Sequence, residues 1–232
     1  MGKRILEVCT DSLQSVINAV EGGAERIELC SALSLDGLTP SIGLLKSVRN
    51  LYPNLKIHVL IRPREGNFVY TDEELSVMIQ DIKEALPYAD AFVSGALDKE
   101  NNINIDSTRR LIESCQGKPF TFHRAFDYCK NPLQELDKLI RIGVNRVLTS
   151  GQQTTAEEGI SLLKQLVQAT NDPNDNHHNL TIMPGGGVNA SNALRILEAT
   201  GAHEIHGSCS IVQKNGIKVT NAKLVKDIIN SI

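Results

Sequence analysis

Short runs of β-branched and other apolar residues alternate eight times with longer amphipathic stretches along this 232-residue chain. The runs predict strands over residues 4–9, 25–30, 55–62, 89–94, 119–124, 144–150, 179–185 and 203–208. The amphipathic stretches predict helices over 11–22, 41–51, 72–86, 105–115, 132–142, 155–169, 190–200 and 221–230. Eight such units indicate either an open doubly wound sheet or a closed (β/α)8 barrel.

A repeated glycine turn connects several of these helices to the strands that follow. At Gly23, Gly143 and Gly201 an expected helix stops, and a strand begins two or three residues later. No G-x-G-x-x-G follows the first strand, where a dinucleotide-binding fold would carry it. We therefore expect a closed (β/α)8 TIM-type barrel, one α/β domain over residues 1–232, with its site at the C-terminal strand ends and a polar loop over 171–179 on the opposite face.

Composition narrows the possible partners and the compartment. With 24 basic and 27 acidic side chains, the formal net charge of -3 provides no basic surface for nucleic acid or an anionic membrane. No apolar run reaches membrane-spanning length and no signal-peptide core precedes the first strand, so we expect a cytoplasmic protein. Five cysteines without a tight spacing pattern favour reduced thiols over a disulfide framework.

One short phrase occurs twice, as Leu6-Glu7-Val8-Cys9 and Ile27-Glu28-Leu29-Cys30. Because side chains alternate along a strand, the glutamate and cysteine of each copy share one face, opposite the aliphatic residues. The same alternation predicts an inward-facing polar set that comprises Glu7, Cys9, Glu28, Cys30, His58, Arg62, Thr121, His123 and His206. Buried carboxylates need partners, and we expect Arg62, on the neighbouring third strand, to pair with Glu7 and Glu28.

This polar set allows more than one function. As an enzyme of the lyase, isomerase or hydrolase type, the chain would hold a small anionic metabolite on Arg62 and use His123, Glu7 or Glu28 as acid or base. Alternatively, the charges form a structural ion-pair network, or the site senses a metabolite without converting it. No sequence feature names a substrate or assigns an activity.

A second anion-binding element is expected after the seventh and eighth strands. Gly185, Gly186 and Gly187 follow the seventh strand and precede a helix, and Ser208 ends the eighth strand with a small side chain. Barrels commonly bind anions on backbone N–H groups at this position. The alternative is that the glycines only turn the chain.

Seven blocks in this order resemble the signatures of the CutC family: Leu6-Glu7-Val8-Cys9, Arg26-Ile27-Glu28-Leu29-Cys30, Gly37-Leu38-Thr39-Pro40-Ser41, Ile61-Arg62-Pro63-Arg64, Thr121-Phe122-His123-Arg124-Ala125-Phe126-Asp127, Arg146-Val147-Leu148-Thr149-Ser150-Gly151 and Met183-Pro184-Gly185-Gly186-Gly187. The resemblance implies a cytoplasmic TIM-type barrel that forms homo-oligomers and serves copper homeostasis by binding Cu(I). The chain departs from the family pattern at Glu65, at Asn67 and over Gly207-Ser208-Cys209.

Copper binding has a physical basis in the thiols. Cu(I) prefers soft sulfur ligands. Cys9 and Cys30 end neighbouring strands, and Cys209 follows the eighth strand on the other side of the first, so all three could approach one ion. The alternative is that they are inert buried thiols. We expect Cys115 and Cys129, on or near helices, to be structural.

Overall fold

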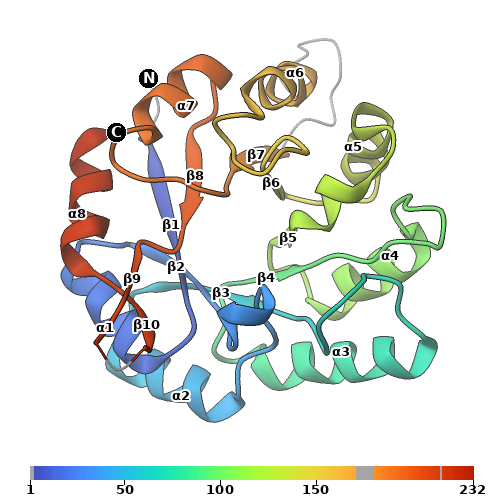
Figure 1. The fold of residues 1–232 in the computed structure, drawn as a ribbon. Helices are drawn as coiled ribbons and strands as arrows, with labels where there is room; N and C mark the ends of the chain where they lie inside the picture. Colours follow the sequence, from blue (N-terminus) through green and yellow to red (C-terminus); the bar gives the residue numbers. More distant parts are fainter. Residues whose placement is uncertain (1–2, 171–179, 215) are drawn as a thin grey trace.

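Eight parallel strands form one sheet at the centre of the molecule (Figure 1). The computed structural model describes residues 3–170, 180–214 and 216–232, so the loop expected over 171–179 lies outside the described residues. The strands are β1 (Ile5–Thr10), β2 (Arg26–Leu29), β3 (Lys56–Leu60), β4 (Ala91–Ser94), β5 (Phe120–Phe122), β6 (Arg146–Thr149), β7 (Thr181–Pro184) and β8 (Glu204–Gly207). Each of them overlaps the strand expected from the sequence.

The sheet curls until its two ends meet. Its strand order is β7-β6-β5-β4-β3-β2-β1-β8, so β8 lies beside β1. A parallel bridge between Gly185 and His206 then connects the end of β7 to β8. The predicted (β/α)8 barrel of TIM type is therefore confirmed.

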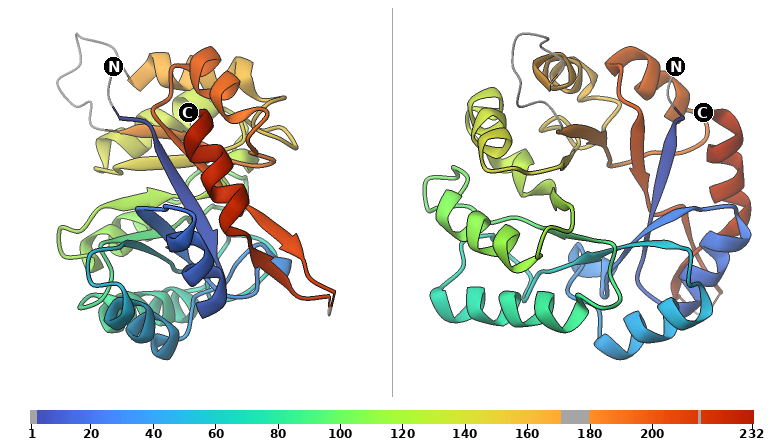
Figure 2. Two further views of the ribbon diagram at one scale, coloured as in Figure 1. Left: turned by 90° about the vertical axis from the view of Figure 1, so that its left-hand side faces the viewer. Right: turned by 180° about the vertical axis from the view of Figure 1, so that it is seen from behind.

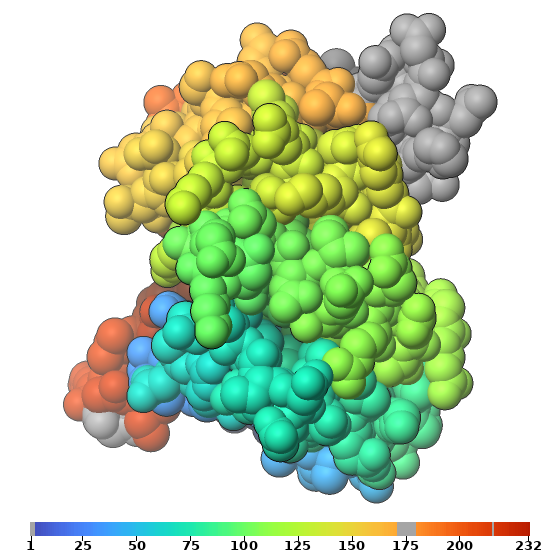
Figure 3. Space-filling view, turned by 90° about the vertical axis from the view of Figure 1, so that its right-hand side faces the viewer, coloured from blue at the N-terminus to red at the C-terminus, as the bar shows by residue number. Residues whose placement is uncertain are grey.

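Eight helices of the described chain surround the strands (Figures 1 and 2). They are α1 (Leu13–Glu21), α2 (Ile42–Leu51), α3 (Asp72–Ala85), α4 (Ile105–Ser114), α5 (Pro132–Arg141), α6 (Ile160–Thr170), α7 (Ala193–Thr200) and α8 (Ala222–Ser231). From α3 to α6, successive units lie side by side in chain order around one side of the barrel (Figure 3). None of the described helices is long and apolar enough to cross a membrane.

Local signals explain most helix starts. Thr71 and Glu74 form the capping box expected at α3, and Ser12 accepts a hydrogen bond from the amide of Ser15 at the start of α1. The helices α6 and α7 begin three or more residues later than predicted. Before α6, the backbone amide of Thr155 donates to the carboxylate of Glu158, and the amide of Glu158 donates to the hydroxyl of Thr155. The side chain of Asn192 accepts from the Asn189 amide before α7.

The apolar core lies between the strands and the surrounding helices. The aliphatic and aromatic residues that alternate with the polar side chains in and beside the strands belong to one buried cluster: Leu6, Val8, Ile27, Leu29, Ile57, Val59, Ile61, Phe120, Phe122, Leu180, Ile182 and Ile205. The glycine turns also form as expected, because Gly23, Gly143 and Gly201 have φ values of 95°, 84° and 78°, where other residues are strained.

The structure contains short elements that the sequence did not indicate. Between β8 and α8 the chain forms an antiparallel hairpin of β9 (Ser210–Val212) and β10 (Lys218–Thr220), which projects from the barrel (Figure 2). Its strands are only three residues long, too short for an alternating pattern to show. Two short 3-10 helices, Leu33–Leu35 and Arg124–Tyr128, were also not predicted.

Candidate functional site

Glu7, in the middle of β1, lies inside the barrel and is fully buried. Its Oε2 atom forms an ion pair with Nε of Arg26 at 2.9 Å and lies 2.7 Å from Nδ1 of His58. Neither contact has the geometry of a hydrogen bond. Its Oε1 atom is 3.0 Å from Nδ1 of His206. Three basic side chains from β2, β3 and β8 therefore surround one carboxylate.

The electrostatic effect of these partners exceeds the cost of burial. Burial by itself raises the pKa of Glu7, but His58, His206 and Arg26 hold it well below the ordinary value of 4.5. Glu7 is therefore ionised around neutral pH and fixes the side chains around it. It does not line the cavity of the barrel, which argues against direct contact with a substrate.

Below Glu7, at the N-terminal ends of the strands, the charge network continues. Nη2 of Arg26 donates to Oε2 of Glu204 at 2.5 Å, and Nη2 of Arg146 donates to Oε1 of Glu204 at 3.1 Å. The sequence analysis missed Arg26, although alternation puts it on the same face of β2 as Glu28. This layer holds the barrel together at a distance from its C-terminal end.

The expected pairing of Arg62 with Glu7 and Glu28 is wrong. Nη1 of Arg62 donates to the carbonyl oxygens of Leu35 and Gly37 at 2.8 and 3.0 Å, and Nη2 donates to that of Gly66 at 3.0 Å. The reason is that β3 ends at Leu60, so the side chain of Arg62 follows the loops rather than the alternation of the strand.

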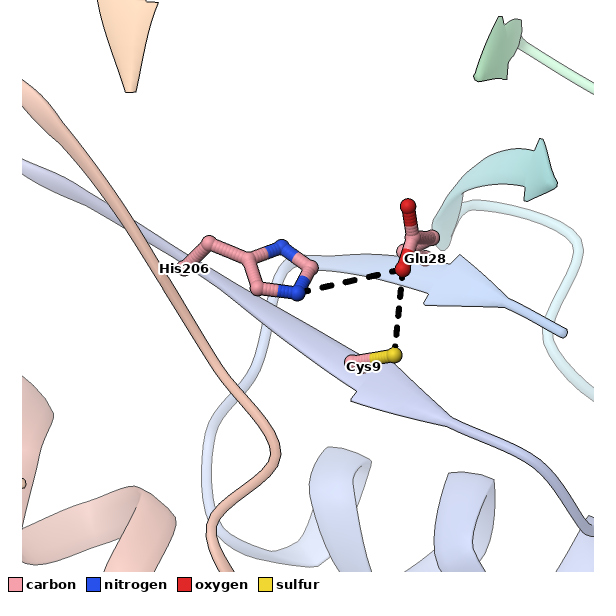
Figure 4. A group of neighbouring side chains, drawn as sticks. All are labelled: Cys9, Glu28 and His206. Carbon is pink, nitrogen blue, oxygen red and sulfur yellow. Dashed lines mark hydrogen bonds and ion pairs between the residues drawn. The ribbon is translucent and has the colours of Figure 1, made fainter. Parts of the chain in front are cut away.

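Above Glu7, one residue short of the ends of three neighbouring strands, Cys9, Glu28 and His206 point toward one another (Figure 4). Sγ of Cys9 donates to Oε2 of Glu28 at 3.0 Å, and Nε2 of His206 is 3.8 Å from the same oxygen. One ligand atom from each of the three lies within 4.8 Å of the others. Cys30 adds a second thiol, because its sulfur is 3.8 Å from that of Cys9.

Cys9, Glu28 and His206 have perturbed pKa values. The contact with Cys30, burial and the charge of Glu28 raise the pKa of the Cys9 thiol well above its ordinary range. Burial lowers the pKa of His206, but the contacts with Cys9, Glu7 and Glu28 outweigh it and raise the pKa well above 6.5. Burial and the nearby Glu7 raise the pKa of Glu28. The cluster therefore holds protons that a cation can displace.

The other cysteines lie apart from this cluster. Cys209 is buried in the main apolar core, whereas Cys9 and Cys30 belong to a separate small cluster with Leu60 and Val93. The sulfur of Cys209 lies 4.0 Å from the carbonyl oxygen of Gly207. Cys115 and Cys129 also lie in the main core, and all five thiols are free.

A cavity of about 480 Å³ opens above the cluster and includes part of the predicted catalytic set. Glu28, Arg62 and His123 line it together with Cys9 and His206. Gly185, Gly186, Gly187 and Ser208 are not part of its lining. Gly186 packs near Ser150, and the hydroxyl of Ser208 contacts that of Ser210 at 3.1 Å.

Comparison with known proteins agrees with this architecture. The CutC family profile matches residues 4–211. The chain belongs to the CutC family. A human member, named copper homeostasis protein cutC homolog, is 42% identical over 221 residues, which cover 95% of this chain and 78% of that protein.

Two bacterial CutC proteins show comparable similarity. A CutC family protein from Bacteroides fragilis is 39% identical over 253 aligned positions, covering 100% of this chain and 98% of that protein. The solved structure of CutC from Streptococcus agalactiae has a TM-score of 0.82 at 34% identity, covering 88% of this chain and 98% of that one. Both the fold and the family expected from the sequence are thereby confirmed.

Proposed function

We propose that this CutC-family chain serves copper homeostasis by binding Cu(I) on Cys9 and Cys30, with His206 and Glu28 completing the site. The supporting observation is the convergence of two sulfurs, an imidazole nitrogen and a carboxylate oxygen from β1, β2 and β8. The human and mouse relatives are named for copper homeostasis, which agrees with a role of this kind. Cys209 is left out of the proposed site because its sulfur lies in a different apolar cluster.

The distance between the two sulfurs suits a shared metal ion. Thiolate bonds to a metal of this size are about 2.3 Å long. Two such bonds to sulfurs 3.8 Å apart enclose an angle of about 110° at the metal. This angle leaves room for a third ligand, which His206 would supply, and the thiols account for selectivity toward a soft ion.

Binding in this site would release protons. The thiols and His206 must lose their protons to coordinate, and Cys9 and His206 hold theirs more tightly than usual. We therefore expect the apparent Cu(I) affinity to rise with pH. Cytoplasmic location and homo-oligomerisation, both implied by the family, remain predictions.

Substitution of the thiols tests the proposal. Binding is measured in anaerobic titrations against a competing Cu(I) chelator. Loss of a residue that only contacts a metal ligand typically weakens binding about 10–100-fold, and Cys9→Ser and Cys30→Ser should each weaken it by more. Cys115→Ser, which removes another buried thiol, is the matched control, and Cys209→Ser should likewise leave binding unchanged. Wild-type affinity in both Cys9→Ser and Cys30→Ser would rule the thiol site out.

A further inference from the structure

His123 lies directly after β5 and is 6% exposed. Its Nδ1 atom accepts a hydrogen bond from the backbone amide of Ala125 at 3.2 Å. An amide can only donate, so Nδ1 must carry the lone pair and the neutral ring must carry its proton on Nε2. The local backbone therefore determines the tautomer of His123.

The Nε2–H group of His123 is buried, and it has no hydrogen-bond partner within the described chain. Buried donors without acceptors are uncommon, because each loses its bond to water without replacing it. The neighbouring ring of Phe68, with a centroid 4.9 Å from that of the imidazole, offers no strong acceptor. A ligand atom that accepts a hydrogen bond would remove this deficit.

His123 is suited to donate rather than to exchange protons. Burial and the nearby Arg62 charge lower its pKa to about 3, so the ring stays neutral around neutral pH. This low pKa favours hydrogen-bond donation over the acid–base role predicted from the sequence. A neutral imidazole with a fixed N–H group polarises an oxygen ligand instead.

A second donor lines the same cavity. Arg124 uses Nε to bond Asp127 at 2.9 Å and Nη2 to bond the hydroxyl of Ser150 at 2.8 Å. Its Nη1 has no hydrogen-bond partner among the residues that the structure describes, and the side chain is 46% exposed. The two bonds hold the guanidinium in place while leaving one N–H edge for a ligand.

The rest of the cavity lining suits the carbon skeleton of a small organic molecule. Leu33, Leu60, Phe68 and Leu148 supply apolar surface around the cavity. Its volume of about 480 Å³ falls within the range of about 300–1,000 Å³ that is typical of small-molecule sites. Arg62 also lines the cavity and gives three of its N–H groups to backbone carbonyls, so the predicted role of Arg62 in anion binding stays a prediction.

We propose that this cavity binds a small organic carboxylate, with oxygen atoms accepting from Nε2–H of His123 and Nη1–H of Arg124. The carbon skeleton packs against Leu60, Phe68 and Leu148. Because Nε2 itself is buried, binding requires the partly buried Phe68 ring to shift. Neither donor belongs to the proposed copper ligands, although Cys9, Glu28 and His206 line the same cavity.

The test uses the full copper-free chain with ¹⁵N-labelled histidine. Acetate, malonate and pyruvate are titrated in NMR experiments that follow the Nε2–H signal of His123, with inorganic phosphate and neutral acetamide as comparison probes. We expect at least one carboxylate to shift this signal at millimolar concentration. Phosphate should bind more weakly, because it has no carbon skeleton to pack against the apolar walls of the cavity.

Variants identify the two donors. His123→Phe should weaken carboxylate binding at least about tenfold, whereas His123→Gln, which retains an N–H donor, should stay within about threefold of wild type. Arg124→Gln should weaken the carboxylates about tenfold and leave acetamide unchanged. Arg109→Gln, on the outer helix α4, is the matched control and should bind as wild type.

Two results would overturn the proposal. One is a His123 signal that none of the carboxylates shifts, which would mean that water alone satisfies the donor. The other is wild-type affinity in a folded His123→Phe protein. Should His123→Phe fail to fold, the wild-type titration and the His123→Gln and Arg124→Gln affinities still decide the question.

Discussion

A single carboxylate organises the interior of this barrel at the residue scale. Glu7 contacts Arg26, His58 and His206, which come from three strands adjoining or near β1. A buried charge is tolerated only when its partners replace the water it has lost. Glu7 also positions His206, which belongs to the cluster with Cys9 and Glu28.

Neutralising Glu7 should therefore be costly. Glu7→Gln leaves three basic groups in the interior without their carboxylate partner. We therefore expect the free energy of unfolding to fall by about 3–5 kcal/mol. Urea denaturation measures this change. Glu100→Gln, at an exposed position, is the control and should stay within about 0.5 kcal/mol of wild type.

The stabilisation by Glu7 should also depend on pH. The pKa of Glu7 in the folded protein lies well below the ordinary 4.5, so its contribution is fully present above about pH 4.5 and is lost as the pH falls toward the folded value. Stability curves of wild type and Glu7→Gln should converge on acidification. A constant difference between the two proteins down to acidic pH would contradict the assignment.

At the scale of elements, Arg62 connects two loops. Its guanidinium joins the loop between β2 and α2, at Leu35 and Gly37, to the loop between β3 and α3, at Gly66. The guanidinium also lies over the ring of Phe68, with Cζ 5.1 Å from the centroid. Both loops border the cavity, so Arg62 shapes its rim without contacting Glu7.

Removing Arg62 should loosen these loops and leave the central network intact. For Arg62→Ala we expect a loss of about 1–3 kcal/mol in unfolding free energy and faster amide exchange in both loops. In double-mutant cycles, Arg62→Ala should add to Glu7→Gln, whereas Arg26→Ala should not be additive with it. Strong coupling between Arg62 and Glu7 would show that the two side chains interact in solution.

At the scale of the whole molecule, the two ends of the chain close the barrel. Strands β1 and β8 pair in parallel, with Glu7 opposite His206. Outside them, α1 packs against α8, where Gly22 lies against the backbone of Ala222 and the side chain of Val225. The closure of the helical layer therefore depends on the absence of a side chain at Gly22.

A methyl group at this contact should destabilise the fold. In Gly22→Ala the new Cβ would lie 2.6 Å from the carbonyl oxygen of Ala222 and 2.6 Å from Cβ of Val225, so α8 must move outward. We expect a loss of about 1–3 kcal/mol, measured by thermal and urea unfolding. Gly43→Ala, in α2, where the new Cβ would lie an ordinary 3.9 Å from the hydroxyl of Ser41, should instead stabilise by about 0.5–1 kcal/mol. Equal effects of the two changes would contradict the packing argument.

Alternation along the chain was enough to predict the barrel and the side of each strand. Strand periodicity is local, so it correctly separated Glu7, Cys9 and Glu28 from Leu6, Val8 and Ile27. The glycine turns likewise depend on local backbone conformation, as Gly143 shows. Sequence blocks characteristic of the CutC family were enough to predict the family.

The tertiary structure alone decided which side chains meet. Arg26 rather than Arg62 pairs with Glu7, because partner choice depends on strand register and on where each strand stops. His206 rather than Cys209 joins Cys9, because the chain turns out of the sheet after Gly207. The free N–H group of His123 depends on the Ala125 amide in the following turn. Each outcome depends on distances across the barrel. These distances cannot be read from the residues that neighbour a position in the sequence.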